Sequence, residues 1–299
     1  MTNFEIDIIN KIRDSISPIL DSIFEFITYL GGQEILILVI VIIYFVFSKK
    51  IGQRIAYAIF GSLLVNNSLK VMVNRVRPFN HPNANYTLND HVLADATGQS
   101  FPSGHAQNSS VAYSSIGFTF KNKNIWSISF ILIVLVALSR VLIGVHYPTD
   151  VIVGVILGIS IAYIGTKLHE KFEEDFYKQM TLYIITAIIF LPVLLIYTNR
   201  LKDSYVLYKD LYTIYAFYIG YILAVFIEKK YLDFNEFPTL KFRVIRATIA
   251  VIIVLGLLLG LKVIFPENVI FDMIRYFSLS FIGLGVYPLL FKKTLFKKN

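Results

Sequence analysis

Long apolar runs recur along almost the whole chain, separated by shorter polar connections. There are nine runs, or eight if the last is shorter than its pattern suggests, at residues 33–48, 52–74, 103–120, 125–143, 149–167, 180–198, 210–228, 245–265 and 269–291. As a helix, each run would cross or nearly cross a hydrocarbon core about 30 Å thick. The pattern therefore predicts an all-α protein, a polytopic bundle of transmembrane helices.

The N-terminal segment follows a different pattern. Ile6, Ile9 and Ile12 recur at helical spacing among charged and polar residues. This spacing predicts an amphipathic helix at the membrane interface. A short hydrophobic helix is expected to follow and to end at Gly31-Gly32.

Composition supports a membrane protein. Of the 299 residues, 56% are hydrophobic and only 16% are charged, whereas soluble domains carry about 25% charged residues. The net charge of +8 could suggest nucleic-acid binding, but the basic residues lie mainly at the ends of apolar runs, which indicates membrane topology instead. The chain has no cysteine, which excludes disulfides and cysteine–zinc sites.

Basic residues gather in alternate connections between the runs. They are Lys49, Lys50, Arg54, Lys121, Lys123, Lys167, Lys171, Lys178, Lys229, Lys230, Lys241, Arg243, Arg246 and the lysines at the C-terminal end. The positive-inside rule assigns these connections to the cytoplasm. The long polar connection 75–102 then lies outside.

Three polar clusters stand at the outer ends of runs. The first runs from Lys70 to Arg77-Pro78. We expect Lys70 and Arg77, seven residues apart, to share one face of a helix. A cation there needs a partner or a wet cavity, although Lys70 alone could also snorkel to the membrane edge.

The second cluster is Pro102-Ser103-Gly104-His105, at the start of a run. A helix start carries free N–H groups and a positive dipole end, which together favour an anion. His105 could donate a proton to a bound group. The alternative is an ordinary N-cap, Ser103, beside an incidental histidine.

The third cluster is Ser139-Arg140, followed by His146 and Asp150. A carboxylate four residues after a histidine can accept one imidazole N–H and leave the other nitrogen free to attack. The alternative is a satisfied polar turn at the membrane surface. Arg140 argues against it, because a guanidinium that deep in an apolar run is costly.

The predicted topology brings all three clusters to the same outer face. Three cations, Lys70, Arg77 and Arg140, without a cluster of carboxylates suit a phosphate group. Two histidines suit a nucleophile and an acid. Nothing resembles a cage of oxygen ligands for a divalent metal, so no metal or other cofactor is expected.

The clusters match, in order and spacing, three motifs of the type 2 phosphatidic acid phosphatase superfamily: K-x6-R-P, P-S-G-H and S-R-x5-H-x3-D. Every fixed position of these motifs is present. The chain resembles that family over about residues 20–170. The resemblance implies a membrane-embedded phosphatase core of about five to six helices, with extra transmembrane helices after it.

The resemblance also implies roles for the motif residues. His146 attacks phosphorus and forms a phosphohistidine, Asp150 orients His146, and His105 protonates the leaving group and then helps to activate water. The phosphoryl oxygens are held by Lys70, Arg77, Ser103, Gly104 and Arg140. The family works without a metal, so positioned cations stabilise the transition state.

We divide the chain into N-terminal helices (1–32), a phosphatase core (33–170) and additional C-terminal transmembrane helices (171–299). The C-terminal helices could shape a groove for lipid, form an oligomer contact or stiffen the bundle. Asp272 and Arg275 are interpreted as a structural ion pair. His81, His91 and His169 are interpreted as solvated loop residues.

The leading hypothesis is a metal-independent phosphatase for lipid phosphates or isoprenyl diphosphates, acting at the outer membrane–water interface of a bacterial cell membrane. A lipid phosphotransferase would share the first half-reaction. A haloperoxidase has the same motifs, but those enzymes are soluble. A lipid transporter would need polar residues near the centres of its helices. The sequence leaves the lipid substrate and the oligomeric state open.

Overall fold

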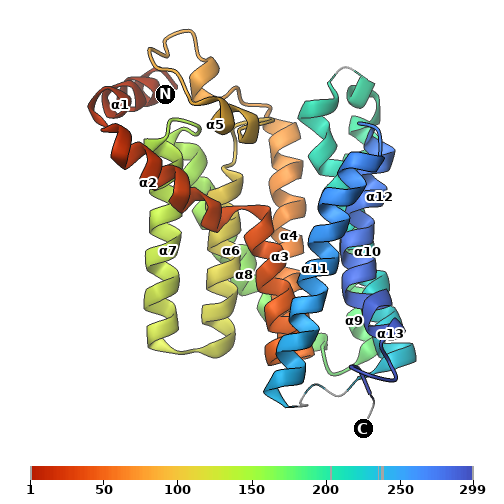
Figure 1. Ribbon diagram of the computed structural model, residues 1–299. Helices are drawn as coiled ribbons and strands as arrows, with labels where there is room; N and C mark the ends of the chain where they lie inside the picture. The colour runs from red at the N-terminus through yellow and green to blue at the C-terminus, as the bar shows by residue number, and fades with distance from the viewer. Residues whose placement is uncertain (1, 203, 235, 237–238, 298–299) are drawn as a thin grey trace. The chain divides into compact units, whose positions relative to one another are not determined.

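A computed structural model describes the chain except for residues 1, 203, 235, 237–238 and 298–299. The described residues form helices and connections without a strand, which confirms the predicted all-α class (Figure 1). The α-helices are α1 (Thr2–Ser15), α2 (Pro18–Thr28), α3 (Gln33–Ile42), α4 (Lys49–Val73), α5 (Asp90–Asp95), α6 (Gly104–Phe120), α7 (Lys123–Leu142), α8 (Pro148–Phe172), α9 (Phe176–Tyr197), α10 (Tyr205–Ile227), α11 (Leu240–Ile264), α12 (Val269–Ser280) and α13 (Tyr287–Leu290). Short 3₁₀ or π turns are η1 (Tyr29–Gly31), η2 (Ile43–Phe47), η3 (Pro78–Asn80), η4 (Thr198–Lys202), η5 (Glu228–Leu232) and η6 (Phe281–Val286).

The helices account for the predicted apolar runs. Within the described chain, 7 helices are long and apolar enough to cross a membrane. The helices Pro18–Gly31 and Gln33–Phe47 meet at a bend of 46°, and counting this pair as one span brings the number to 8. The remaining predicted span, α6, has only 17 residues and carries many buried polar side chains. The chain is therefore a multi-pass membrane protein.

The described chain divides into two compact units. The first combines the chain up to Leu36 with Gly61–Thr166, and the second combines Ile37–Phe60 with the chain from Lys167 onward. All three polar clusters of the sequence lie in the first unit.

The N-terminal helices of the first unit run obliquely across the ends of α6 and α7 (Figure 1). Ile6 and Ile9 of α1 are fully buried and pack against Tyr147. Ser17 caps α2 by accepting a hydrogen bond from the Leu20 N–H. The two helices expected before Gly31 are thus both present, and α1 inserts its apolar face into the unit.

A close contact between α6 and α8 fixes the start of α6. A Cβ on Gly154 would stand 2.8 Å from the Ser103 carbonyl, and a Cβ on Gly158 would stand 2.5 Å from Ser110 Cβ. Only glycine at these positions, four residues apart on one face of α8, allows the two backbones to come so near. The arrangement brings the second and third sequence clusters together.

Hydrogen bonds between polar side chains join α4 to α6. Gln107 Nε2 donates to the Ser62 carbonyl and hydroxyl, both at 2.9 Å, and Gln107 Oε1 accepts from Asn66 at 2.8 Å. These bonds satisfy polar groups that would be costly in lipid. They also hold Lys70, one turn beyond Asn66, over the first turn of α6.

The second unit has a polar network inside it. His169, interpreted from the sequence as a solvated loop residue, is fully buried in α8. Its Nε2 lies 2.7 Å from the Tyr183 hydroxyl, and its Nδ1 lies 3.1 Å from Glu173. The interpretation was wrong because α8 continues beyond the predicted end of its run and buries this turn.

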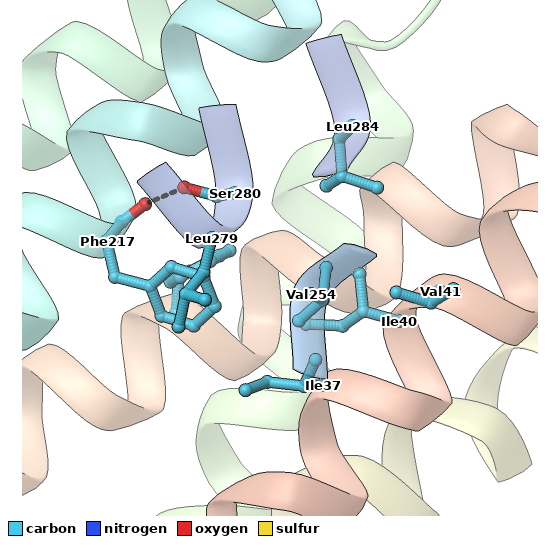
Figure 2. Close-up of a pocket in the computed structure, with 9 residues that line it drawn as sticks. Ile37, Ile40, Val41, Phe217, Val254, Leu279, Ser280 and Leu284 are labelled. Atoms are coloured by element: carbon cyan, nitrogen blue, oxygen red, sulfur yellow. Dashed lines mark hydrogen bonds between the residues drawn. The ribbon is translucent and has the colours of Figure 1, made fainter. Parts of the chain in front are cut away.

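The second unit contains an apolar pocket with an empty volume of about 310 Å³ that includes its opening. Figure 2 shows its lining side chains, among them Ile37, Phe217 and Leu284, and the hydrogen bond from Ser280 to the Phe217 carbonyl. In α12, Arg275 Nη2 and Asp272 Oδ1 lie 3.0 Å apart, which confirms the predicted ion pair.

We expect Gly158→Leu to separate α8 from α6, because its side chain would clash with backbone and Cβ atoms of α6. The thermal midpoint should fall, and turnover of the phosphorylated substrate that the family resemblance implies should fall about tenfold or more, since misplacing a site by about 1 Å can cost more than that. Gly256→Leu is the matched control, because a Cβ there meets nothing within 4 Å. Equal behaviour of the two variants would contradict the proposed close contact.

Candidate active site

Lys70 and Arg77 do not share a helix face, contrary to the prediction. Helix α4 ends at Val73, and Asn74 takes a left-handed conformation with φ 50°. Asparagine tolerates this conformation better than most residues do, so it stops the helix. Arg77 therefore comes from extended chain beyond the helix, while Lys70 lies in its last turn.

Backbone carbonyls of the 75–102 connection orient both cations. Lys70 Nζ donates to the Gln99 carbonyl at 2.7 Å. The Arg77 guanidinium donates to the carbonyls of Thr97, Gly98 and Val145 at 2.5, 3.0 and 3.2 Å. These carbonyl contacts orient the two cations toward His146 and the start of α6.

The second cluster opens α6, as predicted. Ser103 is the N-cap residue and Gly104 the first helical residue. The Ser103 hydroxyl is buried and has no hydrogen-bond partner among the described residues. Lys70 Cε lies 4.0 Å from the point where a Cβ on Gly104 would stand. The helix start therefore faces a cation, which is suitable for an anion.

The third cluster folds into a tight connection between α7 and α8. The N–H groups of Val145 and His146 both donate to the Arg140 carbonyl at 3.2 Å. Gly144 has φ +79°, and the Tyr86 hydroxyl donates to its carbonyl at 2.7 Å. Glycine is needed there because a side chain would meet the Tyr86 ring as well as adopt a rare conformation.

Short contacts join the clusters to one another. Arg77 Nη1 lies 3.2 Å from His146 Nε2, which links the first cluster to the third. The Ser103 N–H donates to the Asp150 carbonyl at 3.0 Å, which links the second to the third. His105 and Arg140 line the same pocket, whose empty volume is about 340 Å³.

His146 is almost completely buried among positive charges. Burial, followed by the charges of Arg77, Arg140 and Lys70, holds the pKa of the His146 imidazole well below its ordinary value. The imidazole is therefore neutral near pH 7 and has a lone pair available. A neutral imidazole facing cations suits a nucleophile for an anionic group.

Asp150 reaches His146 largely through Ser100, a residue that the sequence analysis missed. His146 Nδ1 and Asp150 Oδ2 are 3.6 Å apart, which is too long for a good hydrogen bond. The Ser100 hydroxyl donates to Asp150 Oδ2 at 2.5 Å and lies 3.4 Å from His146 Nδ1. Ser100 lies in the polar connection 75–102, and no spacing rule points to it.

Arg75 and Glu5 were also missed. Arg75 Nη1 pairs with Asp150 at 2.5 Å, and Arg75 Nη2 pairs with Glu5 at 2.7 Å. Glu5 also accepts hydrogen bonds from the Thr149 N–H and hydroxyl at 2.9 and 2.7 Å. Arg75 could have been suspected as a further cation near the first cluster. Glu5 carried no signal, because it lies 144 residues from Thr149 in the chain.

Arg140 turns toward α2. Its Nη1 donates to the Thr28 hydroxyl at 2.5 Å, while its Nε is buried without a hydrogen-bond partner in the described chain. No group of three or more His, Asp or Glu side chains that could hold a metal ion occurs among the residues that the structure describes.

We predict that Glu5→Gln lowers the kcat of the phosphatase reaction that the family resemblance implies about tenfold, or ~1.4 kcal/mol in the barrier. The loss follows because Arg75 would keep only Asp150 as an anionic partner and would shift toward it. Asp7→Asn, an exposed acid on the same helix, is the control. An unchanged kcat in Glu5→Gln would show that α1 does not position Asp150.

Comparison with known proteins identifies the family of this chain. The sequence model of the PAP2 superfamily matches residues 52–174, and that of the transmembrane extension of PAP2 superfamily phosphatases matches residues 212–299. Phosphatidylglycerophosphatase B of Bacillus subtilis is 32% identical over 170 residues, 52% of this chain and 79% of that protein. Undecaprenyl-diphosphatase of Sulfolobus acidocaldarius is 29% identical over 166 residues, 55% of this chain and 78% of that protein. The crystal structure of a PAP2-type phosphatidylglycerolphosphate phosphatase from Bacillus subtilis aligns with a TM-score of 0.48 and 28% identity, over 56% of this chain and 86% of that one. The chain belongs to the PAP2 superfamily, and it is a multi-pass membrane phosphatase.

Proposed function

We propose that the protein hydrolyses a lipid phosphate, or an isoprenyl diphosphate, through a phosphohistidine on His146, without a metal. The observation that carries the proposal is the contact between His146 Nε2 and Arg77, in a buried site shared with the start of α6. A nucleophile beside fixed cations is what phosphoryl transfer without a metal needs. The relatives named above act, by their names, on phosphorylated lipids.

In the first step His146 Nε2 attacks phosphorus, and an N–P bond forms while the P–O bond to the leaving group breaks. Binding of the phosphate anion offsets the neighbouring cations and lets His105 take up a proton, which it then donates to the leaving oxygen; the leaving group departs as an alcohol or a phosphate. Asp150, through Ser100, stabilises the positive charge that develops on the ring. The proton on Nδ1 then faces the Ser100 hydroxyl, which orients the ring.

The transition state gathers negative charge on its non-bridging oxygens. Arg77, Lys70 and Arg140 supply positive charge for them, and the Ser103 hydroxyl and Gly104 N–H supply neutral donors. The buried Ser103 hydroxyl and Arg140 Nε lack protein partners among the described residues, so both are available to a phosphoryl oxygen. Donors already in place need little rearrangement, which is how such sites lower a barrier.

In the second step water attacks the phosphohistidine. His105, neutral after the first step, accepts a proton from that water, and the N–P bond breaks to release inorganic phosphate. His146 returns to its neutral form and His105 regains its proton. Both histidines thus end the cycle in the protonation state in which they began it. Each step is a phosphoryl transfer in which His105 moves one proton.

His146→Ala should reduce lipid-phosphate hydrolysis by roughly 10⁴-fold or more, since removing a nucleophile costs that much. Brief incubation of the wild type with labelled substrate, followed by quenching, should leave an acid-labile and alkali-stable phosphate on the protein, absent from His146→Ala. His81→Ala, in the 75–102 connection, should keep full activity. Retained turnover by His146→Ala would remove this residue from the mechanism.

We further propose that the site faces the outside of a bacterial membrane, as the distribution of basic residues predicts. The chain has no cysteine, so a single introduced cysteine reports its own side of the membrane. Thr87→Cys, exposed in the 75–102 connection, should react in whole cells with a maleimide that cannot cross membranes. Lys123→Cys, exposed at the first residue of α7, should react only after the cells are permeabilised. The reverse labelling would place the site in the cytoplasm.

A further inference from the structure

The pocket beside the proposed phosphoryl site has an acidic wall that the mechanism does not use. Its lining combines His105 and Arg140 with Glu25 of α2 and with His91 and Asp95 of α5. Carboxylates next to a phosphate-binding site repel the substrate's own charge, so they need a reason. Neither helix is part of the three sequence clusters.

Glu25 is held in this wall by hydrogen bonds, and Asp95 is exposed at the end of α5. Glu25 accepts hydrogen bonds from Asn89 Nδ2 at 2.8 Å, and its other oxygen lies 2.9 Å from His91 Nε2. Val92 of α5 is buried in an apolar cluster with Ile143 and Val145, against which Phe24 of α2 also packs. The two helices are therefore fixed relative to the connection that carries His146.

A second feature of this pocket points to a bound group. Arg140 is only 4% exposed, and its Nε has no hydrogen-bond partner among the described residues although the side chain lines the pocket. His105, the proposed proton donor to the leaving oxygen, lines it too. Attack and departure at phosphorus occur roughly in line. With His146 as the nucleophile, the leaving group would thus occupy the side where His105 stands, in this pocket.

We propose that Glu25 and Asp95 select a leaving group that carries hydroxyl groups next to the scissile phosphate, that is, a polyol such as glycerol or a sugar. The inference rests on the proposed function. Ionised carboxylates accept hydrogen bonds and donate none. They accept hydrogen bonds from hydroxyl groups but cannot donate one to an ester carbonyl. Their negative charge also repels the second phosphate of an isoprenyl diphosphate. The pocket would then favour phosphomonoesters of polyols over diphosphates.

Full-length protein in detergent provides the test, with kcat/KM measured for matched lipids. They are phosphatidylglycerol phosphate, the analogue in which propanediol replaces glycerol and removes the hydroxyl, a lipid sugar phosphate, and an isoprenyl diphosphate. The wild type should prefer phosphatidylglycerol phosphate to its propanediol analogue by about tenfold, the scale of a hydrogen bond to a charged group. A similar preference for the lipid sugar phosphate over the propanediol analogue would show that the pocket also accepts sugar hydroxyls.

Glu25→Gln and Asp95→Asn should each lower the hydroxyl preference to about threefold or less and raise relative activity on the diphosphate several-fold, because a like charge is removed. Asp90→Asn, an exposed acid on the same helix as Asp95 and outside the pocket lining, should keep the wild-type ratios. Wild-type ratios in both pocket variants would overturn the proposal.

The wild-type comparison needs no variant, so it decides the question even if a substitution impairs folding. Equal rates on phosphatidylglycerol phosphate and its propanediol analogue would overturn the role of the acidic wall while leaving the phosphatase proposal intact. Absence of phosphate release from all four lipids would instead contradict the proposed function, and this inference with it.

Discussion

The first unit depends on the burial of one carboxylate, that of Asp150. Its side chain is fully buried and accepts hydrogen bonds from Ser100, from the Tyr147 N–H and from Arg75. A buried charge without such partners would be strongly destabilising, by about 3–5 kcal/mol when one partner is removed. The residues that satisfy Asp150 come from segments far apart in the chain. The same residues therefore fold the unit and orient the proposed nucleophile.

The cations of the site impose the opposite constraint. Lys70, Arg77 and Arg140 repel one another and lower the pKa of His146, and a buried cation in a membrane is costly without partners. Carbonyl groups of the connection 75–102 accept hydrogen bonds from Lys70 and Arg77 and so fix where these two positive charges lie. This arrangement also explains why such a polar connection lies ordered across the site.

The sequence predicted the elements well because their signals are local. Apolar runs of sufficient length gave every long helix within a few residues, and Ser103 stands at the start of α6 where a cap was expected. The predicted topology also placed the three clusters on one face of the protein. The motif spacing could not show that Asn74 ends α4 before Arg77, because one left-handed residue overrides a favourable helical spacing. Nor could it pair Glu5 with Thr149, since that contact depends on how α1 packs.

The short, polar helix α6 explains why the proposed chemistry lies at helix ends rather than at the centre of the bundle. Its buried side chains are mostly small or amide-bearing, and several of them contact α4, α8 or the turn after α2. That close contact leaves little space along the helix. At the first turn the packing partners end, and the free N–H groups, the Ser103 hydroxyl and the cations meet there. The proposed lipid substrate could therefore present its phosphate at a helix end while its chains remain in the bilayer, which would spare the enzyme from extracting it.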